Sequence, residues 1–187
     1  HEYTIKINNL KSILKYTVLI IIAGSVANVI LEIDKFMIGQ YVKIENVAYY
    51  GVAIYIATVI GVPSRSMHQI TYPLTAKLLN DKDESGLKEL YQKSSLSLLI
   101  ISGFIFLIIM LNVNELYHLI PEEYTGGVTV VFTIGIVKLF DNALGNNNSI
   151  LFNSDYYRMV LFLGVILAIS TIALNAIFIP KFGINGA

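Results

Sequence analysis

The most constraining feature of this sequence is an apolar run from Met159 to Ile179 that contains no Asp, Glu, Lys or Arg. A helix of this length crosses a hydrocarbon layer roughly 30 Å thick. We therefore expect a protein that spans a membrane. The run stops at Pro180, and residues 185–187 resemble the start of another helix. We therefore expect this chain to be part of a longer protein.

The overall composition agrees with a membrane setting. Hydrophobic residues make up 55% of the chain and charged residues 14%, whereas about a quarter of the residues in soluble domains are charged. Lys plus Arg and Asp plus Glu are equal, at 13 each, so the net charge gives no support for a nucleic-acid partner and we expect none. The absence of cysteine excludes disulfides, zinc–thiolate sites and a cysteine nucleophile.

Apolar segments alternate with charged or turn-forming loops along the chain. We expect helices over approximately residues 16–33, 47–72, 94–113, 126–152 and 159–179. These lengths suit helices that cross a bilayer with some tilt, and the continuous apolar runs lack the strict alternation of transmembrane β-strands. The sequence therefore predicts an all-α membrane protein, with a bundle of about five transmembrane helices.

The positions of the cations predict how these helices are oriented, because cytoplasmic loops carry the excess of Lys and Arg. Placing the N-terminus inside gives a cytoplasmic set of Lys6, Lys11, Lys15, Lys77, Lys82, Lys88, Lys93 and Arg158, against an external set of Lys35, Lys43 and Lys181. The loop from Asn114 to Thr125 contains Glu but no Lys or Arg, which indicates an external loop. We therefore expect the N-terminus of this segment to be cytoplasmic.

Polar residues inside the apolar segments are candidates for function, because an ionisable group at membrane depth is costly and usually faces a cavity or a partner. In the fourth segment, Lys138 and Asp141 are three residues apart, so they share a helix face and can neutralise each other. Asn142, Asn146 and Ser149 continue roughly the same face. This hydrophilic stripe suits the lining of a water-filled cavity or the binding of a polar substrate; a purely structural ion pair is the alternative.

The second segment carries another polar group, directly after a proline. Pro63 removes a backbone hydrogen bond and bends the chain, and Arg65, Ser66, His68 and Gln69 follow it. The planar donor fork of arginine suits phosphate or carboxylate, and histidine can change charge near neutral pH. The alternative is that Arg65 and His68 lie near the inner end of the helix, reach the lipid headgroups and anchor it.

Charged residues also close the first segment. Glu32, Asp34 and Lys35 lie at its expected outer end. A helix cap or an ion pair with a neighbouring helix is the default expectation there, and substrate contact is the alternative.

The sequence shows no catalytic constellation. It contains no glycine-rich phosphate loop, no His-x-x-x-His spacing and no Gly-x-Ser-x-Gly turn. Its three His residues fall in three different segments. We therefore expect no catalytic residues, no metal and no cofactor, and a protein that is not an enzyme.

Four stretches carry a resemblance to a known family. They are Ile33–Gly39 (IDKFMIG), Val47–Ala53 (VAYYGVA), Tyr72–Ala76 (YPLTA) and Leu174–Ala187 (LNAIFIPKFGINGA). The first three resemble the opening of the C-terminal half of bacterial polysaccharide flippases, and the last is similar to the exit of their eleventh helix. These flippases belong to the multidrug, oligosaccharidyl-lipid and polysaccharide exporter superfamily. The resemblance implies that residues 1–187 are a partial C-terminal bundle, similar to the seventh through eleventh helices of a two-bundle transporter with 12 to 14.

The resemblance also implies a function. Such a flippase is a multi-pass protein of the bacterial inner (plasma) membrane, and it moves an undecaprenyl-diphosphate-linked oligosaccharide across that membrane by alternating access. The glycan serves the biosynthesis of O-antigen lipopolysaccharide, capsule or another exopolysaccharide. The implied partners are the lipid-linked oligosaccharide and membrane lipids. Whether a coupling cation is a further partner is left open. The candidate substrate-binding and cavity residues are Arg65, His68, Gln69, Lys138, Asp141, Asn142 and Asn146.

Two alternative functions stay open. A cation-coupled multidrug exporter of the same superfamily would favour acidic cavity residues such as Asp141. A membrane glycosyltransferase or polymerase subunit would be expected to carry a large external loop with paired acids and Arg. The expected external loop from Asn114 to Thr125 is short and lacks Arg.

Overall fold

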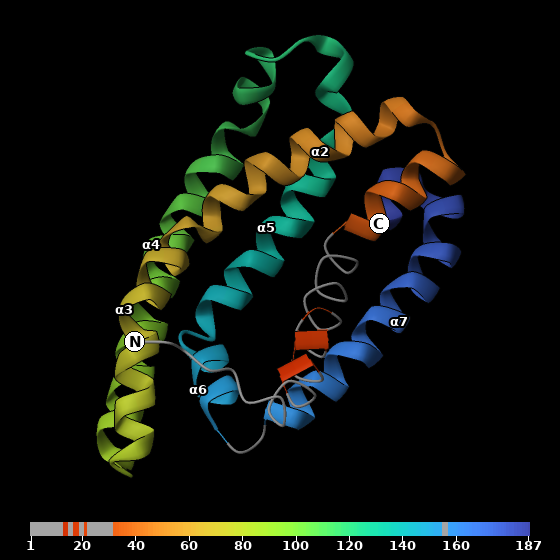
Figure 1. Cartoon of the computed structure of the whole chain (residues 1–187). Coiled ribbons are helices and arrows are strands. Elements are labelled where there is room, and N and C mark those ends of the chain that lie inside the picture. The colour runs from red at the N-terminus through yellow and green to blue at the C-terminus, as the bar shows by residue number, and fades with distance from the viewer. Residues whose placement is uncertain (1–12, 15–16, 19–20, 22–31, 155–156) are drawn as a thin grey trace, which may run out of the picture.

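The computed structural model describes residues 13–14, 17–18, 21, 32–154 and 157–187. Across these ranges the chain forms helices and short turns, with no strands. The first predicted helix, 16–33, lies almost entirely outside the described residues, and the helix described at this end covers residues 32–41. The order of the helices can be followed in Figure 1.

The second predicted helix forms as one long span with a tightened turn in its middle. It consists of α2 (Ile44–Thr58), the 3₁₀ turn η1 (Val59–Gly61) and α3 (Val62–Asn80), which together make 37 residues. Pro63 has no backbone N–H with which to continue the α-helical ladder. Next to it, the N–H of Val62 bonds to the carbonyl of Val59, three residues before, which gives the 3₁₀ turn.

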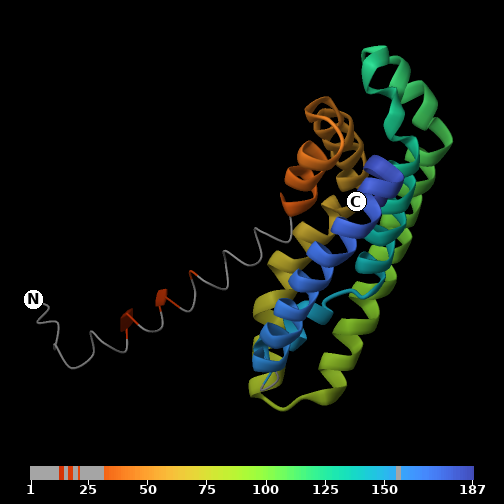
Figure 2. The same cartoon turned by 90° about the vertical axis from the view of Figure 1, so that its right-hand side faces the viewer.

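A hairpin leads into α4 (Glu84–His118), which has 35 residues. Asp83 caps this helix, because its carboxylate accepts the N–H of Gly86 at 2.9 Å. The helix begins well before residue 94, where the third apolar segment was expected to start. The intervening turns are charged and are supported by the Lys93–Glu89 ion pair at 2.6 Å. Figure 2 shows this hairpin at one end of the bundle.

The fourth predicted helix is broken in two. The 3₁₀ segment η2 (Glu122–Gly127) precedes α5 (Val128–Ala143), and α6 (Asn147–Asn153) follows after a bend of 59°. Gly145, within the bend, has a φ of 59°. Glycine takes up this left-handed conformation without the steric penalty of a Cβ atom, so the helix can turn there.

The last helix, α7 (Tyr157–Phe182), continues two residues past Pro180 and is followed by the 3₁₀ segment η3 (Gly183–Gly186). The sequence predicts that the apolar run stops at Pro180. Instead the α-helix continues to Phe182, and the φ of 61° at the following Gly183 is typical of a glycine that terminates a helix.

Length and composition identify the spans. Within the described residues, the helices Ile44–Asn80, Glu84–His118 and Phe162–Gly186 are long and apolar enough to cross a membrane, and α5 with α6 makes a fourth if the bent pair counts as one span. Large apolar side chains on α4, such as Phe104 and Leu111, are exposed, as expected of a lipid-facing surface. The chain is therefore an all-α membrane protein, which confirms the predicted fold class.

The apolar core lies where α2, α4 and α5 meet. Small side chains let these helices approach closely: Ala53, Ala57 and Gly135 are all buried. A Cβ atom at Gly135 would lie 3.1 Å from Ile60 Cδ1 and 3.0 Å from Phe106 Cε2. The buried hydrophobic residues of this cluster are Met37, Ile38, Tyr50, Ala53, Ala57, Ile60, Ile109, Val113, Tyr117, Val130, Val131 and Ile179. This packing holds η1, in the middle of the long span, against α5.

Candidate functional site

Arg65 lies close to the middle of the long span Ile44–Asn80. At 1.5 Å per residue it is about 22 Å along the helix axis from Asn80. The side chain is exposed. The cavity role and the anchoring role of Arg65 both stay predictions, because the apolar part of the span lies mainly before it, in α2 and η1, and α3 after it is largely polar.

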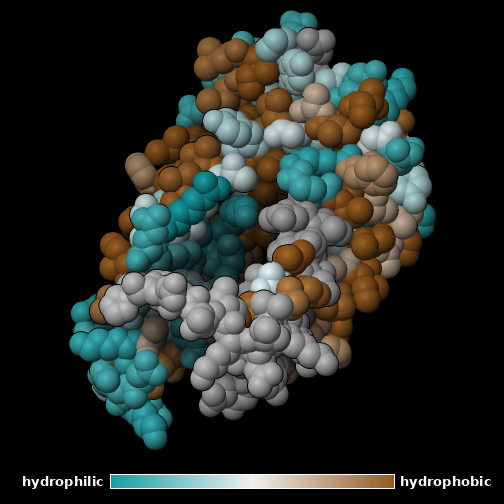
Figure 3. Space-filling view, viewed as in Figure 1, coloured by the Kyte–Doolittle hydropathy of each residue, from teal (hydrophilic) through white to brown (hydrophobic). Residues whose placement is uncertain are grey.

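Several polar side chains of α3 share the face of Arg65. His68, Gln69 and Tyr72 follow it at three, four and seven residues, the spacing of one helix face. Gln69 and Tyr72 are exposed, and His68 is half-buried. Figure 3 shows hydrophilic side chains gathered in a hollow near the middle of the molecule, with hydrophobic ones on the outer surface beside it. Sequence reasoning missed Tyr72, although its position seven residues after Arg65 could have indicated it.

Lys138 reaches the same level of the bundle from α5. A Cβ atom built on Gly61 would lie 3.7 Å from Lys138 Cδ, so the side chain of Lys138 runs along the bare backbone of η1. Gly61 precedes Arg65 by four residues, or about one helical turn. The two cations therefore come from different helices, with Lys138 against Gly61 and Arg65 about one helical turn after it.

The structure contains no ion pair between Lys138 and Asp141. The side-chain ion pairs of the described residues join Lys35 to Glu32 and Lys93 to Glu89. Asp141 is exposed, whereas Lys138 is half-buried with its stem against Gly61. Three residues of separation allow a pair but do not require one, and here packing against η1 draws Lys138 toward α3. Within the described part of the chain, Lys138 therefore has no carboxylate that compensates its charge.

Asn142 is buried, with 1% of its surface exposed. Its Nδ2 donates to the backbone carbonyl of Ile60 at 2.9 Å and to Ser102 Oγ at 2.6 Å. The carbonyl belongs to η1 and the serine to α4. In this structure the amide thus joins three helical segments; a direct role in substrate binding stays a prediction.

Asn146 is fully buried in the bend between α5 and α6. Its Nδ2 donates to Thr75 Oγ1 on α3 at 3.0 Å, and its Oδ1 accepts the hydroxyl of Ser94 on α4 at 3.2 Å. The Ser95 hydroxyl donates to the carbonyl of Ala143 beside it. Asn146 therefore holds the bend against α3 and α4, and its role in substrate binding also stays a prediction. Sequence reasoning did not identify these hydroxyl partners, because their pairing depends on long-range contacts.

Glu32, Asp34 and Lys35, at the expected outer end of the first segment, form contacts within the protein. Lys35 Nζ pairs with Glu32 at 2.7 Å, and Tyr50 Oη on α2 donates to Asp34 Oδ2 at 2.6 Å. Both contacts are structural, but the ion pair lies within one helix and the contact with α2 is a hydrogen bond, so neither is the predicted cap or ion pair with a neighbouring helix. Among the described residues, no group of three His, Cys, Asp or Glu is placed to hold a metal ion.

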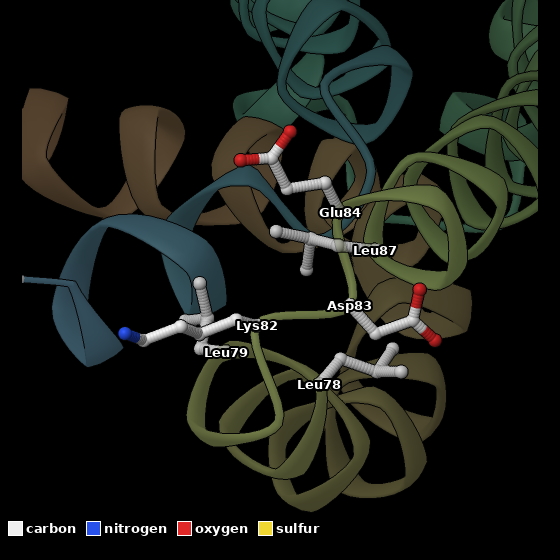
Figure 4. Close-up of a pocket in the computed structure, with 6 residues that line it drawn as sticks. All are labelled: Leu78, Leu79, Lys82, Asp83, Glu84 and Leu87. Carbon is white, nitrogen blue, oxygen red and sulfur yellow. The ribbon is translucent and has the colours of Figure 1, made fainter.

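A separate pocket of about 220 Å³ lies at the hairpin between α3 and α4, as Figure 4 shows. Its lining residues are Leu78, Leu79, Lys82, Asp83, Glu84 and Leu87. None of the predicted site residues lines it, and it belongs to the end of the bundle rather than to the level of Arg65 and Lys138.

Comparison with known proteins identifies the family. The model of the family described as MatE matches residues 19–177, which is most of the chain. This chain belongs to the MatE family. That family is part of the predicted exporter superfamily, and its members are membrane transporters rather than enzymes. Searches of curated proteins and of solved structures found no match.

The family settles the class of this MatE protein, but not its substrate. It is a multi-pass membrane transporter, as the apolar helices already indicated. The alternative of a glycosyltransferase or polymerase subunit is excluded, because MatE proteins are not enzymes. Whether the substrate is a lipid-linked oligosaccharide or a drug depends on the side chains of the candidate site.

Proposed function

We propose that this MatE protein is part of a flippase that moves an undecaprenyl-diphosphate-linked oligosaccharide across the bacterial inner membrane for polysaccharide biosynthesis. The observation that carries the proposal is the position of Arg65 and Lys138. Lys138 packs against Gly61 at the α2–α3 break, Arg65 lies about one helical turn after Gly61, and neither has an ion-pair partner among the described side chains. A pair of uncompensated cations at membrane depth suits an anionic cargo.

The chemistry of the two cations fits a diphosphate. The guanidinium of Arg65 can donate two parallel hydrogen bonds to one phosphate, and the ammonium of Lys138 supplies a compact charge for the other. Gln69 lies one turn beyond Arg65 on the same face and is exposed. Its amide can both donate to and accept from sugar hydroxyls. The same face thus offers charge for the diphosphate and hydrogen bonds for the glycan.

Alternating access would carry the cargo across. In this mechanism two helical bundles rock about a central polar site, so that the site opens to one side of the membrane at a time. With the N-terminus of this segment in the cytoplasm, the α3–α4 hairpin and its cations would lie at the inner surface. The lipid-linked sugar would enter the hollow from the inner leaflet and leave toward the outer one.

A cation-coupled multidrug exporter is the second candidate, and one observation favours it. Asp141 is exposed on α5 and forms none of the ion pairs of the described residues. A free carboxylate at this depth could bind a coupling cation or a cationic drug. The two candidate functions therefore differ in which side chains transport requires: Arg65 and Lys138 for a flippase, or Asp141 for a multidrug exporter.

Complementation of a flippase-null strain with the full-length protein tests the proposal. Arg65→Ala should abolish glycan export with little loss of protein from the membrane, whereas Arg65→Lys should keep part of it, because the charge survives without the bidentate fork. Lys77→Ala is the matched control, since it removes an exposed cation from the end of the same helix. Normal export by Arg65→Ala would return Arg65 to an anchoring role and remove the main support for a flippase.

A further inference from the structure

The structure contains two helix breaks, and the last turn of the helix before one of them contacts the other. The α2–α3 break is η1, residues 59–61, next to Pro63. The α5–α6 break is residues 144–146, where the axis bends by 59° around Gly145. Each break alone is a common way for a membrane helix to change direction. What distinguishes this pair is that a buried side chain directly before the α5–α6 break bonds to the backbone of the α2–α3 break.

That side chain is Asn142, in the last turn of α5 directly before the α5–α6 break. Its Nδ2 donates to the carbonyl of Ile60, which belongs to the α2–α3 break, and to Ser102 Oγ on α4. Because the amide is buried, water cannot readily replace either partner. Moving one break relative to the other would leave the Ile60 carbonyl or the amide without a partner, which is costly in a dry interior.

The α5–α6 break is also fixed on its other side. The Ser95 hydroxyl donates to the carbonyl of Ala143, and a Cβ atom at Gly145 would lie 2.8 Å from Ser95 N and 2.9 Å from Ser95 Cα. The bend thus seats its backbone directly on the backbone of α4. A change in the bend angle has to move Asn142 with it, because α5 leads into the bend without a flexible linker.

We propose that Asn142 couples the two breaks, so that the bend between α5 and α6 and the 3₁₀ turn between α2 and α3 change together when the transporter changes conformation. Lys138 lies one turn before Asn142 on α5, and Arg65 lies one turn after Gly61 on α3. Joint movement of the breaks therefore changes the spacing of these cations. The coupling does not depend on which substrate the transporter carries. Its test is therefore independent of the test of the flippase proposal.

Distances between spin labels across each break test the coupling in the full-length protein in lipid nanodiscs. One pair of labels, at Tyr55 and Ile70, spans the α2–α3 break, and another, at Val137 and Phe152, spans the α5–α6 break. All four side chains are exposed. Gly145→Ala perturbs the α5–α6 break directly, because its new Cβ meets the backbone of Ser95.

With Asn142 present, Gly145→Ala should shift the mean distance of both pairs, by about 1–2 Å as for other packed helices that slide. In the Asn142→Ala background, the same change should shift the pair across α5–α6 alone. Asn148→Ala, at an exposed position on α6, is the matched control and should leave both distances unchanged.

A shift confined to the α5–α6 pair while Asn142 is intact would overturn the coupling. Equal shifts of the α2–α3 pair with and without Asn142 would overturn it as well. If Gly145→Ala does not yield folded protein, Asn142→Ala alone replaces it: the coupling then requires a broader distance distribution across α2–α3, and an unchanged distribution contradicts it.

Discussion

Replacing Gly127 with Ala should destabilise the protein, whereas the same change at the neighbouring Gly126 should have almost no effect. A Cβ atom at Gly127 would lie 2.7 Å from Tyr117 Oη and 2.8 Å from Ala53 Cβ. A Cβ atom at Gly126 would have nothing within 4 Å. The two glycines are adjacent in η2, so they form a closely matched pair.

The size of the effect follows from these contacts. Carbon atoms pack at about 3.5–4.0 Å, so α2 and η2 would have to separate by about 0.7–1.2 Å to accept the new methyl group at Gly127. Overpacking of this kind costs about 1–3 kcal/mol in the free energy of unfolding. Exposed changes away from such contacts stay within about 0.5 kcal/mol, which is the expectation for Gly126→Ala.

Unfolding of the purified full-length protein in detergent, by heat or by titration with denaturing detergent, measures the difference. Ala53→Gly removes the nearest carbon atom, so in that background Gly127→Ala should cost less, and a double-mutant cycle isolates the contact. Equal stability of the two glycine variants would refute the packing described for η2. A cost at Gly127 that is unchanged by Ala53→Gly would show that the helix contact is not its cause.

Two further predictions concern topology and charge. Single cysteines at Ser85 and Glu122, beyond the two ends of the apolar part of α4, should label from opposite sides of the membrane, Glu122 from outside; labelling from one side would contradict the orientation predicted from the cations. Lys138→Ala and Asp141→Ala should have additive effects on transport and on membrane abundance, because no ion pair joins the two residues; a double variant milder than either single one would mean that they neutralise each other after all.

The sequence predicts much of the fold because the bilayer imposes a simple rule. A helix must stay apolar over the thickness of the hydrocarbon layer, so α4 and α7 follow directly from runs such as Met159 to Ile179. Helix ends outside that layer escape the rule, which is why α4 begins at Glu84 rather than near residue 94. The bend at Gly145 was also missed, since a single glycine and a run of Asn residues are compatible with a continuous helix.

The candidate site divides in the same way. The shared face of Arg65 and Gln69 follows from helical periodicity alone. The bonds of Asn142 do not, because its partner Ile60 is 82 residues away in the sequence, and no local pattern reports which helices pack together. Lys138 was predicted in part. Its place in an apolar segment identified it as a cation at membrane depth, but its contact with Gly61 could not be predicted, because it depends on how α5 packs against η1.

The most direct test of the proposed function is translocation by the purified full-length protein in liposomes. The substrate is a fluorescent undecaprenyl-diphosphate-linked sugar, and enzymatic access to the sugar from outside the liposomes reports its movement between leaflets. The wild-type protein should accelerate this movement, and Arg65→Ala should abolish the acceleration while Lys77→Ala retains it. Transport of a cationic drug driven by an ion gradient, with no movement of the lipid-linked sugar, would contradict the flippase proposal and favour the multidrug exporter.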